Sequence, residues 1–208
     1  KGAIRVPQDA NFKFVPEASE QRQDGSTYKA VTYQYVDPGG QFQIDKTFEL
    51  QPDTPYGVKM RVTVQNLRDQ GTVVDSMAVD IFGYNDPDEE TSWMNFRPNG
   101  INGSCYTTNG LNRSSHSGIE EALSYDGVDI KWGAIDTRYF TLTNIPLDDN
   151  IESCSLQKVD EGYLRTRIET GDMTIPAGES QSFEHLMYLG PKHVDVLAEV
   201  DKGLSKDV

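Results

Sequence analysis

Residues 56–66 have the sequence YGVKMRVTVQN, in which an apolar side chain recurs at every second position from Val58 to Val64. A period of two places these side chains on one face of a β-strand, because successive side chains point to opposite faces. The preceding residues 41–50 have a similar pattern at their even positions, interrupted once by Lys46. Two such segments, separated by turn residues 51–55, predict neighbouring strands with one buried face.

The pattern extends in both directions from this pair. Residues 28–36 are a predicted strand, joined to 41–50 by the turn Asp37-Pro38-Gly39-Gly40, in which proline fixes φ and glycine permits positive φ. The further predicted strands are 73–82, 94–96, 103–107, 128–132, 137–143, 151–159, 163–169 and 182–189. The pair Gly133-Ala134 is expected to separate two of them, 120–125 to form a helical turn, and 1–27 to be an irregular or edge segment.

Short strands at this spacing predict an all-β fold of two packed, mainly antiparallel sheets, formed by residues 1–208 as a single domain. The ten Tyr and eight Phe favour strands, and the 18 Gly favour turns. From Lys192 the apolar spacing changes to three and four residues, which predicts a short C-terminal α-helix over 192–204. Its predicted docking stripe consists of Val194, Leu197, Val200 and Leu204.

The chain carries a formal net charge of −14. This charge argues strongly against a nucleic-acid partner, whose phosphates need clustered cations, and against an anionic membrane surface. No stretch approaches the ~20 apolar residues that a spanning helix needs. The chain starts at Lys1 without a signal peptide, so we expect a part of a larger protein, with any membrane anchor outside it.

The two cysteines, Cys105 and Cys154, are not in a Cys-x-x-Cys pair, so a zinc or thioredoxin-like site has no support. In an oxidising compartment they could form a disulfide. Otherwise they would be two buried thiols that pack as small apolar side chains. The residues alone leave both alternatives open.

No arrangement typical of an enzyme is recognisable. The three histidines, His116, His185 and His193, lack the spacing of zinc ligands, and the acidic segment 86–90 lacks the glycine and distal glutamate of a calcium loop. There is no Gly-x-Ser-x-Gly elbow and no phosphate-binding loop. We therefore predict no catalytic residues, no metal and no cofactor.

Two longer motifs resemble the periplasmic domain of the bacterial YidC-type membrane protein insertases. The first is IKWGAIDTRYF at 130–140, followed by Asn144-Ile145-Pro146, and the second is MYLGPK at 187–192 before the predicted helix. The resemblance rests on these positions: Trp132, Gly133, Tyr139, Phe140, Pro146, Gly190 and Pro191.

The resemblance implies a β-supersandwich similar in shape to sugar mutarotases, with a short C-terminal helix. It also implies a location on the periplasmic side of the inner membrane, tethered by transmembrane helices outside this chain. The implied partners are Sec translocon subunits and membrane proteins during insertion. A periplasmic address would favour pairing of Cys105 with Cys154. The helix over 192–204 would fix the orientation of the sandwich to a transmembrane segment that follows.

A carbohydrate-binding or mutarotase-like domain of the same shape is the alternative function. Aromatic side chains in a cleft could stack on a sugar, and Trp93, Tyr106 and Trp132 are the candidates. Turnover would in addition need an acid–base pair, which the sequence does not reveal.

Overall fold

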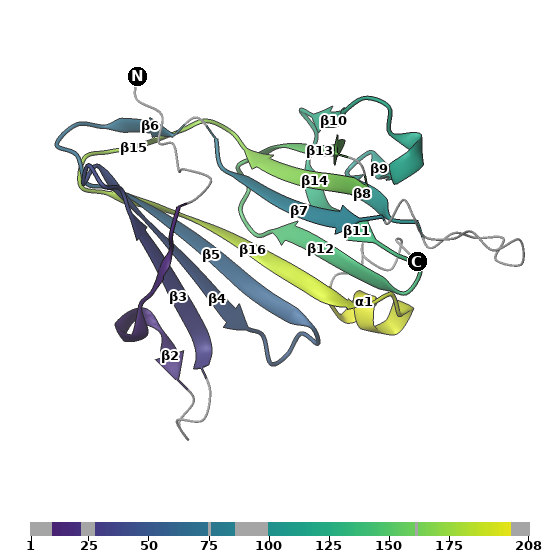
Figure 1. Ribbon diagram of the computed structural model, residues 1–208, viewed down its shortest axis with the longest axis horizontal. Coiled ribbons are helices and arrows are strands. Elements are labelled where there is room, and N and C mark those ends of the chain that lie inside the picture. The colour runs from purple at the N-terminus through teal and green to yellow at the C-terminus, as the bar shows by residue number, and fades with distance from the viewer. Residues whose placement is uncertain (1–9, 22–27, 75, 86–99, 161, 201–208) are drawn as a thin grey trace, which may run out of the picture.

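The computed structural model describes residues 10–21, 28–74, 76–85, 100–160 and 162–200. It confirms the predicted fold class: two antiparallel sheets pack on each other, and one short α-helix lies at the C-terminal end (Figure 1). Ten strands form the large sheet: β1 (Lys13–Phe14), β2 (Glu20–Gln21), β3 (Tyr28–Val36), β4 (Phe42–Leu50), β5 (Gly57–Asn66), β8 (Asn102–Thr107), β9 (Gly110–Ser115), β11 (Ile130–Asp136), β12 (Phe140–Pro146) and β16 (Ser180–Pro191).

The large sheet has the spatial order β1-β3-β4-β5-β16-β12-β11-β8-β9, with β2 paired to β3. The second sheet has the order β10-β13-β14-β7 and consists of β7 (Ala78–Tyr84), β10 (Leu123–Asp126), β13 (Ile151–Asp160) and β14 (Tyr163–Thr170). A small sheet pairs β6 (Thr72–Val74) with β15 (Met173–Ile175). The helices are α1 (Val194–Val200) and the short 3-10 turns η1 (Pro16–Ala18) and η2 (His116–Gly118).

The alternating stretch around residue 60 forms β5, at the middle of the large sheet. It pairs with β4 so that Ile44 lies opposite Val64 and Phe48 opposite Met60, and these residues share one face. On its other side β5 pairs with β16, the strand that leads into α1. The turn before β4 uses Gly40 at φ 64°, a conformation that glycine adopts without steric cost.

The second sheet covers only part of the large one. It packs against β8, β11 and β12, and the core between the sheets includes Ile135, Leu156 and Ile168. A second core lies where β4, β5 and β16 meet the small sheet, around Phe42, Val64, Ile175 and Phe183. A third lies under α1, on the opposite face of the large sheet. The part of the large sheet formed by β3, β4 and β5 therefore extends beyond the second sheet (Figure 1).

Three local predictions were wrong. Residues 73–82 are not one strand, because β6 and β7 belong to different sheets. Gly133-Ala134 does not separate two strands: β11 passes through it, and the turn lies at Thr137–Tyr139. Residues 123–126 form the strand β10 instead of a helical turn. Leu123 and Tyr125, two positions apart, both point toward the core between the sheets and pack against it. The predicted strand 94–96 and the acidic segment 86–90 lie outside the described residues.

Candidate functional site

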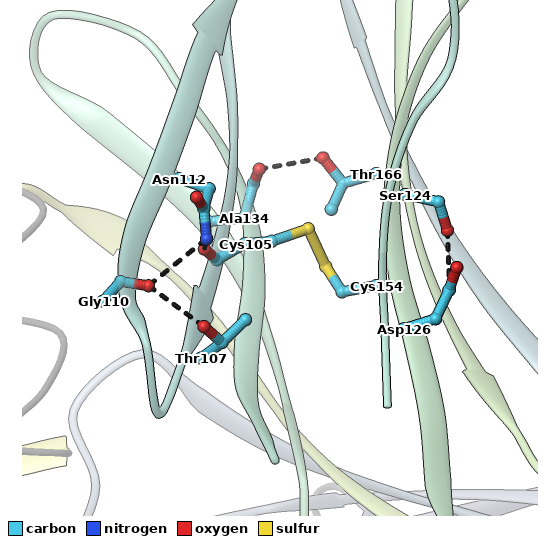
Figure 2. Close-up of a disulfide and its surroundings, with 9 residues drawn as sticks. All are labelled: Cys105, Thr107, Gly110, Asn112, Ser124, Asp126, Ala134, Cys154 and Thr166. Carbon is cyan, nitrogen blue, oxygen red and sulfur yellow. Dashed lines mark hydrogen bonds between the residues drawn. A yellow bond between two sulfur atoms is a disulfide. The ribbon is translucent and has the colours of Figure 1, made fainter. Parts of the chain in front are cut away.

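A disulfide joins the two sheets where they overlap. Cys105 on β8 and Cys154 on β13 are both fully buried, with their sulfur atoms 1.98 Å apart and their Cα atoms 6.0 Å apart (Figure 2). Beside it, Thr166 of the second sheet donates a hydrogen bond of 2.9 Å to the carbonyl oxygen of Ala134 in the large sheet. This part of the molecule is buried and cross-linked, so its role is structural.

The residues of the family motif divide between the interior and the surface. Trp132 is fully buried and packs on Tyr106, with ring centroids 5.3 Å apart. Gly133 faces the second sheet, where an added Cβ would lie 2.9 Å from Cγ2 of Thr166. By contrast, Tyr139 and Phe140 are 61% and 62% exposed.

The other motif residues lie where β12 and β16 pair. Pro191 stands opposite Phe140, and Pro146 stands opposite His185. Gly190 permits a close approach, since an added Cβ would lie 2.6 Å from the Tyr188 hydroxyl and 2.8 Å from the Tyr56 ring.

Helix α1 docks on the outer face of the large sheet. Leu197 is fully buried in a cluster with Trp132, Ala134, Ile145 and Tyr188, and Val196 and Val200 pack against the same cluster. Val194 differs from the prediction, because it is 49% exposed. Val196 and Val200 are one helical turn apart and lie beside Leu197. The buried face of the helix is therefore rotated toward Val196, relative to the predicted stripe, and Val194 lies at the border of this face. Leu204 lies outside the described residues.

A buried carboxylate holds the start of this helix in place. Asp136 at the end of β11 forms ion pairs with Lys192, at 2.8 Å, and with Arg113 of β9. Burial raises the pKa of Asp136, although the two cations and their hydrogen bonds act in the opposite direction. The cluster ties Lys192, two residues before α1, to two strands of the large sheet.

The three histidines do not come together. His185 is buried, with Nδ1 2.8 Å from Oδ1 of Asn144, and burial lowers its pKa to about 4, so it is neutral at physiological pH. His116 lies at η2, and His193 is exposed just before α1. Over the described ranges, no group of three or more His, Cys, Asp or Glu side chains could hold a metal ion. In the same ranges, no helix is long and apolar enough to cross a membrane.

The feature that sequence reasoning missed is an apolar face that the described residues leave uncovered, here called the open face. Cross-strand partners place its side chains in rows on the inner side of β3, β4, β5 and β16, and directly opposed residues share a face. Its members are Val31, Tyr33, Lys46, Phe48, Leu50, Val58, Met60 and Leu189, the last of which lines one hollow with Leu50 and Val58. Tyr33, Leu50 and Leu189 are exposed and the others are half-buried, because the second sheet stops before reaching them.

Lys46 is the one charged member of the open face. Its ammonium lies 4.1 Å from the centre of the Phe12 ring, a cation–π contact, and burial lowers its pKa. It lines a hollow of about 360 Å³ between the open face and the start of β7. A second hollow of about 650 Å³ lies at the other end of the face, beside Leu50, Val58 and Leu189. The open face is therefore apolar, concave in two places and marked by one cation.

The comparison with protein families agrees with this geometry: the model of the YidC periplasmic domain matches residues 1–208. The chain belongs to the YidC periplasmic domain family. Among curated proteins, the membrane protein insertase YidC of Syntrophus aciditrophicus is 26% identical over 172 residues, which cover 81% of this chain and 30% of the relative. The insertase of Geobacter sulfurreducens is 20% identical, covering 96% of this chain and 36% of the relative. This YidC domain thus spans about a third of the length of the curated relatives it matches.

Solved structures show the same fold in carbohydrate enzymes. A galactose mutarotase related enzyme from Lactobacillus acidophilus superposes with a TM-score of 0.57 at 12% identity, covering 86% of this chain and 71% of that chain. An α-galactosidase from Lactobacillus brevis gives a TM-score of 0.56 at 10% identity, covering 90% of this chain and 27% of that chain. At these identities the likeness concerns the fold alone.

Proposed function

We propose that this YidC domain is a non-catalytic interaction domain of a membrane protein insertase. It would lie on the periplasmic side of the inner membrane, tethered by transmembrane segments outside the 208 residues. It would contact membrane proteins during their insertion and folding, alone or together with Sec translocon subunits. The observation that carries the proposal is the open face.

The open face has the properties of a binding surface. Monomeric proteins rarely leave large contiguous apolar patches exposed, and such patches commonly mark interaction sites. A transmembrane segment of a protein that is being inserted is itself apolar. If it covered the open face, binding would gain about 25 cal/mol for each Å² of apolar surface removed from water. Lys46, within this face, would favour an occupant with a carboxylate or a free carbonyl oxygen opposite it.

The absence of catalysis is supported by what surrounds the candidate groups. His185 is buried, neutral and hydrogen-bonded to an amide, so it is poorly placed to exchange protons with a substrate. The carbohydrate alternative lacks stacking rings at the predicted positions: Trp132 is buried under α1 and Tyr106 packs on it. Trp93 lies outside the described residues.

Site-specific photocrosslinking in a full-length insertase that carries this domain would test the proposal. A photoreactive phenylalanine analogue replaces Tyr33 on the open face, and the same analogue replaces Phe82 in a control variant. Both positions are exposed aromatic residues on strands, but Phe82 lies on the second sheet, opposite Arg165 of β14. We expect crosslinks to an inserting protein or a translocon subunit from position 33 and few from 82. Equal yields from both positions, or none from either, would contradict the proposal.

A further inference from the structure

The large sheet ends in a group of exposed apolar side chains on the side where α1 lies, here called the aromatic end. Its members are Tyr56, Tyr139, Phe140, Leu189 and Val194, all of them exposed. They come from the β4–β5 turn, the β11–β12 turn, the start of β12, the end of β16 and the first residue of α1. These elements meet at one end of the molecule (Figure 1).

Backbone hydrogen bonds join the turns and strands that carry these side chains. The amide of Leu189 donates to the carbonyl oxygen of Tyr56 at 3.0 Å, and the amide of Lys192 donates to that of Tyr139 at 2.7 Å. Phe140 stands opposite Pro191 in the pairing of β12 with β16. The aromatic end is therefore a rigid feature of the sheet, although its rings come from separate turns.

Tyr56 is held in an unusual backbone conformation. Its φ of 62° lies in the left-handed region, where a bulky residue is disfavoured and glycine is the usual choice. Its side chain nevertheless remains exposed. The ring also packs edge-on against Tyr188, with centroids 6.1 Å apart, so the strained backbone holds a partly packed ring at the surface. Strained residues of this kind are often found at functional sites.

The opposite end of the sheet has a different character. Its turns, 37–41, 67–71, 127–129, 147–150, 171–172 and 176–179, carry Asp37, Asp69, Asp129, Asp148, Asp149, Asp172 and Glu179, with Arg68 as their one cation. Leu67 and Leu147 are exposed there, but each lies next to or near a carboxylate. At the aromatic end, the β4–β5 turn carries one carboxylate, Asp53, and the β11–β12 turn carries Arg138, whose guanidinium lies 5.2 Å from the centre of the Tyr139 ring.

We infer that the aromatic end rests in the headgroup region of a zwitterionic lipid bilayer, with the acidic end directed away from it. The inference rests on the proposed function, which places this domain in a membrane protein. Tyrosine suits this location because its ring is apolar and its hydroxyl is polar. Rings at the tips of separate turns suit a broad lipid surface better than a peptide, which would need a groove. Arg138 can reach a lipid phosphate from its position over Tyr139.

Fluorescence from a single site tests this orientation. Both native cysteines are in the disulfide, so Phe140→Cys introduces one reactive thiol, which is labelled with an environment-sensitive dye. Leu147→Cys, at the acidic end, provides the matched control. On titration of the 208-residue chain with phosphatidylcholine vesicles, we expect a blue shift and brighter emission from position 140 but not from 147. Anionic lipid added to the vesicles should weaken the response, because the chain carries a charge of −14.

Substitution then tests the side chains themselves. The double substitution Tyr56→Ser and Tyr139→Ser should reduce partition of the protein into the vesicles about tenfold, because the variant has two fewer aromatic rings to transfer from water into the bilayer. The pair Leu67→Ser and Leu147→Ser should leave partition unchanged. No response from position 140, or equal responses from 140 and 147, would overturn the inference. Neither outcome bears on crosslinking from Tyr33, so failure here and failure of the proposed function are distinguishable.

Discussion

The two halves of the large sheet have the same strand pattern but different surroundings. In the covered half, formed by β8, β11 and β12, the sheet lies between α1 on one face and the second sheet on the other. In the half formed by β3, β4 and β5, the part of the chain that the structure describes covers the inner face only near the small sheet, and the open face remains. The comparison teaches that alternation specifies which side chains share a face, whereas covering that face requires a second layer.

The largest expected effect concerns the disulfide of the covered half. Replacing Cys105 and Cys154 with alanine removes a link between residues 49 apart, which should lower the free energy of unfolding by about 4 kcal/mol on the chain-entropy model. Urea unfolding of the oxidised protein and the double variant measures the difference. If the two midpoints coincide, the link contributes little and the covered half owes its stability to packing alone.

Next in size is the helix that completes the covered half. Leu197→Ala should cost roughly 3 kcal/mol, because it leaves a cavity among Trp132, Ala134 and Tyr188. Val194→Ala, on the same helix but exposed, should change stability by less than about 0.5 kcal/mol. Hydrogen exchange of amides 194–200 provides a second measurement. Exchange at the rate of a free peptide in the unaltered protein would show that α1 is not docked.

A pH experiment tests the border between the halves, where His185 of β16 lies opposite Met60 of β5. Burial lowers the pKa of His185 to about 4 from the ordinary 6.5. Between these values the unfolded chain binds a proton that the folded chain does not, so stability falls as the pH drops from 6.5 to 4. The loss attributable to this group is about 3 kcal/mol. His185→Gln should flatten the curve in this window, and a curve parallel to that of the unaltered protein would refute the assignment.

A smaller effect is expected from replacing Gly133, which lies at the contact between the two sheets. Gly133→Ala places a Cβ 2.9 Å from Cγ2 of Thr166 and 3.2 Å from Sγ of Cys154, so these side chains or the sheets that carry them must shift, at a cost of about 2 kcal/mol. Gly71→Ala is the control, since no atom lies within 4 Å of its added Cβ. Thermal unfolding should separate the two variants. Equal melting temperatures would indicate that the covered half is less tightly packed than the distances imply.

These features differ in how far the sequence predicts them. The strands that became β3, β4 and β5 could be predicted, since their period-two pattern is local. The division of 73–82 between two sheets could not, because both pieces are apolar and the change of sheet depends on distant partners. Gly133 was interpreted as part of a connection, although its small size serves a contact with β14. The open face could not be predicted for the same reason: its exposure depends on where the second sheet stops.

The smallest expected effect distinguishes a covered position from a position on the open face within a single strand, β5. Val58 and Val64 lie on the same face of β5, but Val64 is buried beneath the small sheet and Val58 is a half-buried member of the open face. Threonine has nearly the shape of valine, so each substitution replaces one methyl group with a hydroxyl group at almost the same volume. Val64→Thr should cost about 1–2 kcal/mol, because the hydroxyl is buried, whereas Val58→Thr should cost less than about 0.5 kcal/mol, because water can reach it. Urea unfolding of both variants gives the difference. Equal costs would mean that Val58 is covered as well, and the open face would then be too small to receive a partner.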